Sequence, residues 1–294
     1  MFFAVDEEVL ILPSPAPSGR FLLQMREGNG IYQRFLNLSV RLRLAAFLSL
    51  GSLAFGANAL QPLISDDTGT QGAGGYQIEF AVSQSQERFD GETTRLLSAP
   101  LVFTRGMTDT LDVYVGAAYA RIHPNKDGNN SGISNPLVGA KWRFYENVES
   151  KTSLALKPEI IFPMSAGREE AGLGVGKTSG SVMMLLTQEF GFGAVLVNAA
   201  VGRDRFRHAD DETYGRFSVA PIWNLTEKWQ LALDMGVESR RSDGVTTYLR
   251  YAELALLYSL NKDIDLALGF LVSADNQNPR ATTMVPIGSV SWRF

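Results

Sequence analysis

Charged side chains stand at alternate positions within apolar segments of this 294-residue chain. Asp112 lies between Leu111 and Val113, and Asp234 lies between Leu233 and Met235. A charge is tolerated on such a face when it meets water or an opposite charge, as it does in the lumen of a membrane barrel. The candidate lumen-lining residues are Glu79, Asp112, Lys141, Arg143, Lys157, Glu159, Glu189, Asp234, Glu238, Glu253, Asp265 and Arg293. These ions could line a pore for a solute, or they could pair across a filled interior and only stabilise it.

A second polar group could support hydrolysis of a bond. His208, Asp210 and Asp211 fall in a predicted loop, and a histidine beside carboxylates can activate water. Such a site needs a second acidic pair on a facing loop, and Asp90 and Asp127 are isolated candidates. We therefore expect a solvated loop, no catalytic residue and no enzyme.

The segment 171–178, with the sequence AGLGVGKT, fits the loose form of a phosphate-binding loop. A true phosphate loop directly follows a buried strand and opens a helix. Here three charged residues, 168–170, precede the segment and no helical stripe follows it. We expect a flexible outer loop instead.

Composition excludes several other classes of chemistry. The absence of cysteine removes disulfides, thiol nucleophiles and cysteine-based zinc sites. His123 and His208 are the only histidines, which argues against a multi-histidine metal site. The net charge of -4 provides no broad attraction for nucleic acid. We expect no metal, no cofactor and no nucleic-acid partner.

The chain carries the pattern of a secretory signal peptide over residues 36–59. Arg41 and Arg43 precede an apolar run over 44–55, and the small-residue cleavage site consists of Ala57 and Ala59 around Asn58. The apolar run is too short to cross a bilayer, which takes about 20 residues in a helix. The expected mature protein begins at Leu60.

Residues 1–35 are unusual in front of a signal peptide. Three prolines, at 13, 15 and 17, interrupt this stretch and disfavour regular structure. We expect a non-native or disordered extension that results from a start site placed too far upstream, with Met25 as a better start.

Alternation with a period of two recurs through the rest of the chain, and that period is typical of strands with one apolar face and one polar face. The predicted strands are 75–86, 93–105, 110–121, 134–145, 151–162, 179–190, 194–205, 213–225, 229–240, 247–259, 264–273 and 282–294. Short connections alternate with generally longer ones. An even number of strands with this loop asymmetry predicts an all-β fold: a 12-stranded antiparallel up-and-down transmembrane barrel of the bacterial outer-membrane type.

Aromatic residues gather beside the short connections, as expected for a girdle at the membrane–water boundary. Examples are Trp142, Phe190 and Trp229. The last predicted strand ends in Phe294, and its alternating pattern resembles the C-terminal signal by which barrels are recognised for assembly. We therefore expect outer-membrane lipid and the barrel assembly machinery as partners.

The start of the mature chain resembles the MetA-pathway of phenol degradation family of bacterial outer-membrane proteins, which are often described as transporters. The residues that carry the resemblance are Pro62, Asp66, Asp67, Gly69, Thr70, Gln71 and Gly72. Ser65 departs from the family pattern, in which we expect Thr. The resemblance spans the mature domain and implies passage of small, aromatic or hydrophobic compounds. From the cleavage site and the first predicted strand, we expect a periplasmic lead-in segment, 60–74, and a transmembrane β-barrel, 75–294.

Asp66 and Asp67 support two interpretations of the lead-in segment. Asp-Asp-Thr-Gly favours a local turn, because its side chains can bond to the backbone, and the segment would then simply lead into the first strand. Alternatively, the two carboxylates reach an inward cation such as Arg143 or Arg293 and narrow the periplasmic mouth.

The sequence thus favours a porin-like outer-membrane channel that passes a small-molecule solute passively. The alternatives are a structural or adhesive barrel with a closed lumen and, less favoured, a hydrolase at the outer rim.

Overall fold

The computed structural model describes residues 62–89, 92–124, 129–276 and 282–294. The predicted extension and signal peptide, with Ala57 and Ala59, lie outside the described residues. No helix among the described residues is long and apolar enough to cross a membrane.

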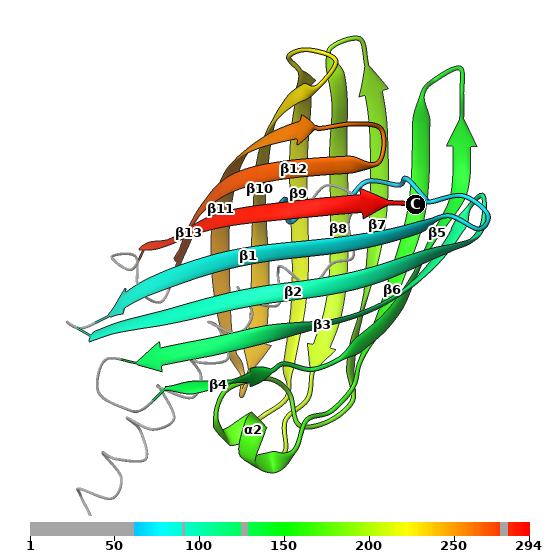
Figure 1. Cartoon of the computed structure of the whole chain (residues 1–294). Coiled ribbons are helices and arrows are strands. Elements are labelled where there is room, and N and C mark those ends of the chain that lie inside the picture. Colours follow the sequence, from blue (N-terminus) through cyan, green and yellow to red (C-terminus); the bar gives the residue numbers. More distant parts are fainter. Residues whose placement is uncertain (1–61, 90–91, 125–128, 277–281) are drawn as a thin grey trace, which may run out of the picture. The chain divides into compact units, whose positions relative to one another are not determined.

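Almost all of the described chain is strand, as the period of two predicts. The strands are β1 (Tyr76–Phe89), β2 (Glu92–Thr108), β3 (Leu111–Pro124), β4 (Asn130–Ile133), β5 (Leu137–Asn147), β6 (Thr152–Ile161), β7 (Ser179–Phe190), β8 (Gly193–Asp204), β9 (Glu212–Asn224), β10 (Trp229–Ser242), β11 (Val245–Ser259), β12 (Ile264–Asp275) and β13 (Thr282–Arg293). Figure 1 shows them following one another around the wall.

The strands form a closed antiparallel barrel. Each wall strand pairs with its neighbours in sequence, β2 pairs with β3, and β1 pairs with β13 to close the ring. At the seam, the Tyr76 N–H donates to the Phe294 carbonyl at 2.9 Å and the Phe294 N–H donates back at 3.0 Å. Every described wall strand except β4, which pairs with β3 alone, therefore pairs on both sides, as a spanning sheet requires. The predicted 12-stranded fold is confirmed.

The fourth wall strand consists of two pieces. β4 and β5 pair one after the other along β3, which is why thirteen strands make a twelve-stranded wall. The break between them contains Pro136, which has no N–H to donate to the ladder. Pro158, Pro221 and Pro286 lie in strands on the outward face, whereas Pro100 is buried on the inward face.

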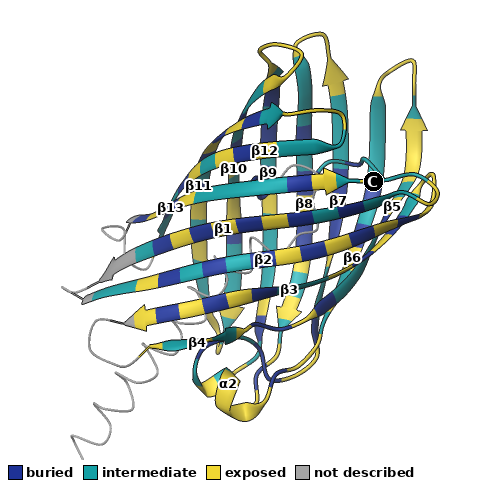
Figure 2. Ribbon diagram, viewed as in Figure 1, coloured by how far each residue is buried: buried dark blue, intermediate teal, exposed yellow. Residues whose placement is uncertain are grey.

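Burial alternates along each strand, as Figure 2 shows. Inward residues are largely buried. Outward apolar residues such as Leu101, Val201 and Leu268 are exposed in the isolated chain, and in a membrane the lipid would cover them. Exposed aromatic rings lie beside the short turns. The Phe190 and Phe192 rings stack at 5.2 Å, and the Trp229 and Tyr258 rings lie 4.5 Å apart.

The loop between β6 and β7 contains the phosphate-loop-like segment and the short helix α2 (Ala166–Glu170). We expected a flexible outer loop here, and the structure shows that Asn135 binds it at several points. Its side-chain amide donates to the carbonyls of Phe162 and Val175, and its Oδ1 accepts from the Val175 N–H at 2.7 Å. A Cβ on Gly174 would meet Asn135 Oδ1 at 1.7 Å. Close packing therefore explains this glycine without a phosphate.

Candidate functional site: the barrel lumen

Residues 62–75 lie inside the barrel and are called the lumen segment here. Its Pro62 end approaches β12, and its other end lies on β2, where the Gly74 N–H donates to the Gly106 carbonyl at 2.9 Å. Gly106 must be glycine, since a Cβ there would meet the Gly72 carbonyl oxygen at 1.7 Å. The described part of the expected periplasmic lead-in over 60–74 finds hydrogen-bond partners on the inward faces of the strands.

Asp66 anchors the lumen segment through two lysines. Its carboxylate accepts from Lys141 Nζ on β5 at 2.9 Å and from Lys157 Nζ on β6 at 3.0 Å, and its side chain is fully buried. Asp67 is more exposed and lies 3.7 Å from Lys141 Nζ, while its Oδ1 accepts from the Gly69 N–H. The prediction that these carboxylates reach Arg143 or Arg293 is wrong, because both arginines lie near the short turns, where they bind other groups.

Ser65 anchors the segment to the opposite side of the wall. Its N–H donates to Asp234 Oδ2 at 2.6 Å, and its hydroxyl donates to Asp234 Oδ1 and hydrogen-bonds to the Ser218 hydroxyl. Asn198 brackets the Asp66 backbone: its Oδ1 accepts from the Asp66 N–H, and its amide donates to the Asp66 carbonyl. These bonds fix both the position and the direction of the segment.

The rest of the segment is held in the same manner. The Thr68 N–H donates to Thr187 Oγ1 at 3.1 Å, and its hydroxyl bonds to that of Ser153. The Gln71 N–H donates to both carboxylate oxygens of Asp112. Each of these contacts of residues 65–71 involves a side chain, and backbone bonds to the wall appear only at Gly74 and Gly75 among the described contacts of the segment.

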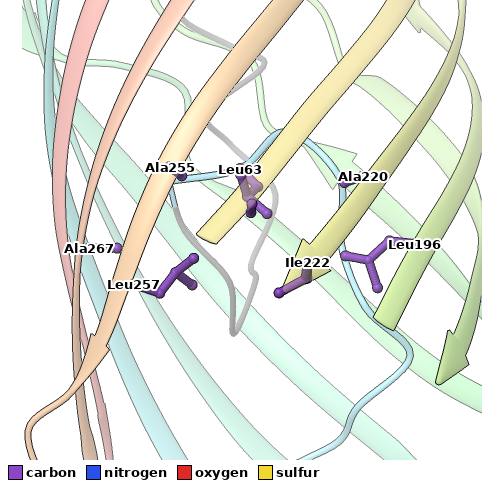
Figure 3. Close-up of a cluster of buried hydrophobic side chains, with 8 residues drawn as sticks. Leu63, Leu196, Ala220, Ile222, Ala255, Leu257 and Ala267 are labelled. Atoms are coloured by element: carbon purple, nitrogen blue, oxygen red, sulfur yellow. The ribbon is translucent and has the colours of Figure 1, made fainter. Parts of the chain in front are cut away.

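An apolar patch faces the other side of the segment. Leu63 packs among inward residues of β8 to β12, including Leu196, Ile222 and Leu257 (Figure 3). Ile64 packs with Tyr251 and Leu271. The lumen therefore has a charged cluster near β3, β5 and β6 and an apolar patch toward the short-turn ends of β8 to β12.

A second ion network lies toward the outer end of the lumen. Arg240 Nη1 contacts Asp204 at 3.1 Å and Glu212 at 3.0 Å, and its Nε donates to Glu238 Oε1 at 2.6 Å. The guanidinium also lies over the Tyr214 ring at 4.9 Å. The network joins β8, β9 and β10 from the inside.

The predicted lumen residues divide into three groups. The buried inward residues are Glu79, Asp112, Lys141, Lys157, Asp234, Glu238 and Glu253. Glu159, which accepts from the Tyr114 hydroxyl, is half-buried on the same face. The remainder lie near the short turns: Arg143 contacts Glu146, Asp265 pairs with Arg293, and Glu189 is exposed at the rim and does not line the interior.

Glu253 has an unusual environment. Its side chain is buried, and neither carboxylate oxygen has a hydrogen-bond partner among the described residues. It pairs in register with Asp234, and a Cβ on Gly269 would meet both Glu253 Oε1 and Pro62. Pro62 of the lumen segment therefore lies close to a buried carboxyl group.

Sequence reasoning missed the neutral residues that hold the segment, above all Asn198, Ser218 and Thr187. It also missed Arg216 and Arg240 as lumen cations. The alternation of each strand does place the neutral residues on the inward face: Asn198 is two residues from buried Leu196, and Ser218 is two residues from buried Ala220. No pattern marked these positions, because single neutral polar residues are common on inward faces.

The rim residues do not form the arrangement expected of a hydrolase. Asp211 binds Arg203 at 2.9 Å and Arg205 at 3.4 Å, and His208 Nε2 lies 3.8 Å from Glu170. Asp90 and Asp127 lie outside the described residues. The hydrolase alternative receives no support from the described residues.

Comparison with protein-family models and with curated proteins gives no match. Solved structures do match. The COG4313 outer membrane channel from Pseudomonas putida F1 aligns with a TM-score of 0.59 and 13% identity, covering 78% of this chain and 98% of that one. The fold is that of an outer-membrane barrel.

Two further structures share the architecture. The translocator domain of the autotransporter NalP from Neisseria meningitidis has a TM-score of 0.52 and 11% identity, with 86% of this chain and 97% of that chain covered. The NanC porin has a TM-score of 0.51 and 10% identity, with 72% and 98% covered. At these identities the likeness establishes the fold, and the resemblance to the phenol degradation family remains a prediction.

Proposed function

We propose that this chain is a channel of the bacterial outer membrane that passes small, partly apolar solutes passively. The observation that carries the proposal is the lumen itself: a closed wall surrounds a charged cluster and an apolar patch, and the lumen segment contacts both. Sites with an apolar lining and a few placed polar groups suit small organic ligands. The family resemblance favours aromatic or hydrophobic compounds among them.

The attachment of the lumen segment supports movement during passage. Residues 62–71 contact the wall through side chains, so their release breaks none of the strand pairing that keeps the barrel closed. A shift would also admit water to Glu253, and burial of a carboxyl group without a hydrogen-bond partner is costly. The segment can therefore leave its place while the wall stays intact.

The burial of Leu63, Ser65 and Asp66 favours a second candidate function. In it, the segment fills the lumen permanently, and the barrel serves a structural or adhesive role through its loops. The two functions differ in whether the segment must move, and this can be tested directly.

A reversible lock on the segment distinguishes the two functions. The Ser65 and Ser218 hydroxyl oxygens lie 2.8 Å apart, so Ser65→Cys/Ser218→Cys places two thiols within reach of a disulfide in a chain that has no other cysteine. The mature variant is inserted into planar bilayers, and conductance is recorded before and after addition of reductant. We expect current to rise on reduction, and Ser65→Cys alone to be insensitive to the reductant.

Each outcome of this experiment is decisive. Current in both redox states would mean that solute passes beside the segment, and the channel would stand. Silence in both states, with insertion verified, would contradict the channel and support the closed barrel. Reversible block of the open current by a small phenol, but not by glucose, would support the proposed solute class.

A further inference from the structure

The outward face of the wall holds an open groove of about 880 Å³ near the outer ends of β6 to β11. Two rows of residues paired in register line it. The upper row is Ile160, Gly180, Arg203, Thr213, Arg241 and Thr246. The lower row is Pro158, Val182, Val201, Gly215, Ser239 and Tyr248.

Small residues make the groove. Gly180 and Gly215 have no side chain, and Ser239 beside Gly215 has a short one, so the floor is close to the backbone. Pro158, Val182 and other apolar side chains provide the walls. A Cβ on Gly215 would come no closer than 3.5 Å to another group, which means that strand packing does not require glycine there.

Two arginines stand at the outer edge of this apolar groove. Arg203 and Arg241 flank Thr213, one strand away on either side, and each lies one residue before the outer end of its strand. Two strand spacings separate their backbones by roughly 10 Å. They are therefore placed to contact two anionic groups, or one broad headgroup, above a chain lying in the groove.

The charge on the outward face is of one sign. Among strand residues whose side chains are described, the outward face carries no Asp or Glu, and its ionisable groups other than tyrosine are Arg95, Arg105, Arg121, His123, Arg203, Arg241 and Arg250. All but Arg105 lie in the half of the barrel with the outer loops. An arginine on a lipid-facing surface is costly at the membrane midplane but not near a headgroup that it can bind.

The nearby loop neutralises only part of this charge. Asp211 pairs with Arg203 and Arg205, whereas the Arg241 guanidinium makes no ion pair within the described part of the chain. Slight burial tends to raise the pKa of Asp211, but the Phe206 N–H and the Arg203 guanidinium hold it below its ordinary value. Asp211 is thus ionised at neutral pH, and a net positive charge remains at the groove.

We propose that this groove binds a phosphorylated glycolipid of the outer leaflet, with phosphate at Arg203 and Arg241 and an acyl chain over Gly180 and Gly215. The inference rests on the outer-membrane placement in the proposed function but not on conduction. Guanidinium groups form bidentate, charge-assisted hydrogen bonds with phosphate. The apolar floor continues the lipid-facing surface, which suits a bound lipid better than a free anion.

Native mass spectrometry of the full mature protein in detergent, titrated with diphosphorylated lipid A, tests the proposal. We expect Arg203→Gln/Arg241→Gln to weaken binding roughly thirtyfold, since each arginine near an anionic lipid surface contributes a factor of about five. Arg105→Gln is the matched control, because it removes an outward arginine at the short-turn end, and it should bind as the wild type does.

Gly215→Val tests the contribution of the groove's shape separately from that of its charge. It fills the floor without removing an arginine, and we expect it to weaken lipid A binding while the wall folds normally. Dephosphorylated lipid A should bind the wild type as weakly as lipid A binds the double variant. Equal binding by the wild type and the double variant, an equal loss in Arg105→Gln, or equal affinity for phosphatidylglycerol would overturn the proposal. None of these outcomes depends on conductance, so failure here leaves the channel standing.

Discussion

Asp66 is the residue on which the position of the lumen segment depends most. It is fully buried between two lysines from different strands; Lys141 also lies 3.7 Å from Asp67, and Lys157 lies 3.9 Å from Glu159. Such a buried pair adds little net stability compared with an apolar replacement, but removal of one partner leaves an uncompensated charge. The Asp66 ion pairs therefore fix the position of the segment specifically.

Asp66→Asn is expected to release the lumen segment. Loss of the carboxylate from two buried lysines costs about 3–5 kcal/mol, which exceeds what the remaining neutral hydrogen bonds at Ser65 and Thr68 can offset. A Ser65→Cys reporter, buried in the wild-type background, should react with a water-soluble thiol reagent at least about tenfold faster in Asp66→Asn. Asp67→Asn is the control and should change the rate little, since Asp67 is partly exposed. Equal rates in all three backgrounds would show that the lysines do not hold the segment.

Three pairs of neighbouring strands share one packing device. An inward tyrosine lies over the glycine opposite it in register: Tyr114 over Gly139, Tyr214 over Gly202, and Tyr251 over Gly236. The ring covers backbone that glycine leaves bare, and the pairing helps to fix strand register. The Tyr114 hydroxyl then reaches Glu159, and the Tyr251 hydroxyl reaches Asp234. The pairs thus connect wall register to the lumen charges.

Gly236→Val should destabilise the wall, because its Cβ would lie 2.5 Å from the Tyr251 hydroxyl oxygen and 2.6 Å from ring atoms. Overpacking of this kind costs about 1–3 kcal/mol. The urea midpoint of unfolding, followed by the difference in gel migration between heated and unheated samples, should fall. Gly215→Val, on the next strand and facing outward, should leave it unchanged. A Gly236→Val midpoint equal to that of the wild type would mean that the ring moves aside without cost.

Over the whole molecule, charge is divided by face. The outward face of the described strands carries only basic ionisable groups besides tyrosine, whereas acidic side chains outnumber basic ones on the inward face. One of these acidic side chains is Glu253, neither of whose carboxylate oxygens has a hydrogen-bond partner within the described ranges. An open lumen would therefore have a negative potential.

Open channels of this protein should select cations over anions. A lumen with excess negative charge concentrates cations, and a potassium-to-chloride permeability ratio of the order of several-fold is expected. The reversal potential across a bilayer with a KCl gradient measures the ratio. Glu253→Gln should lower the ratio without affecting insertion, since Glu253 forms no ion pair with a described residue. A reversal potential with the sign expected for chloride selectivity would contradict this assignment of charge to the lumen.

The sequence determined the wall, and the tertiary structure decided what the wall contains. Alternation is a local property, set by the geometry of a strand between lipid and water, so single segments such as 264–273 were sufficient to predict their own fold and the inward face of Asp112 and Asp234. The partners of Asp66 are not local. Lys141 and Lys157 are 75 and 91 residues away, and only closure of the ring brings them to the same side of the lumen. The break at Pro136, the rim position of Glu189 and the groove between Arg203 and Arg241 depend likewise on register between strands, which no single segment encodes.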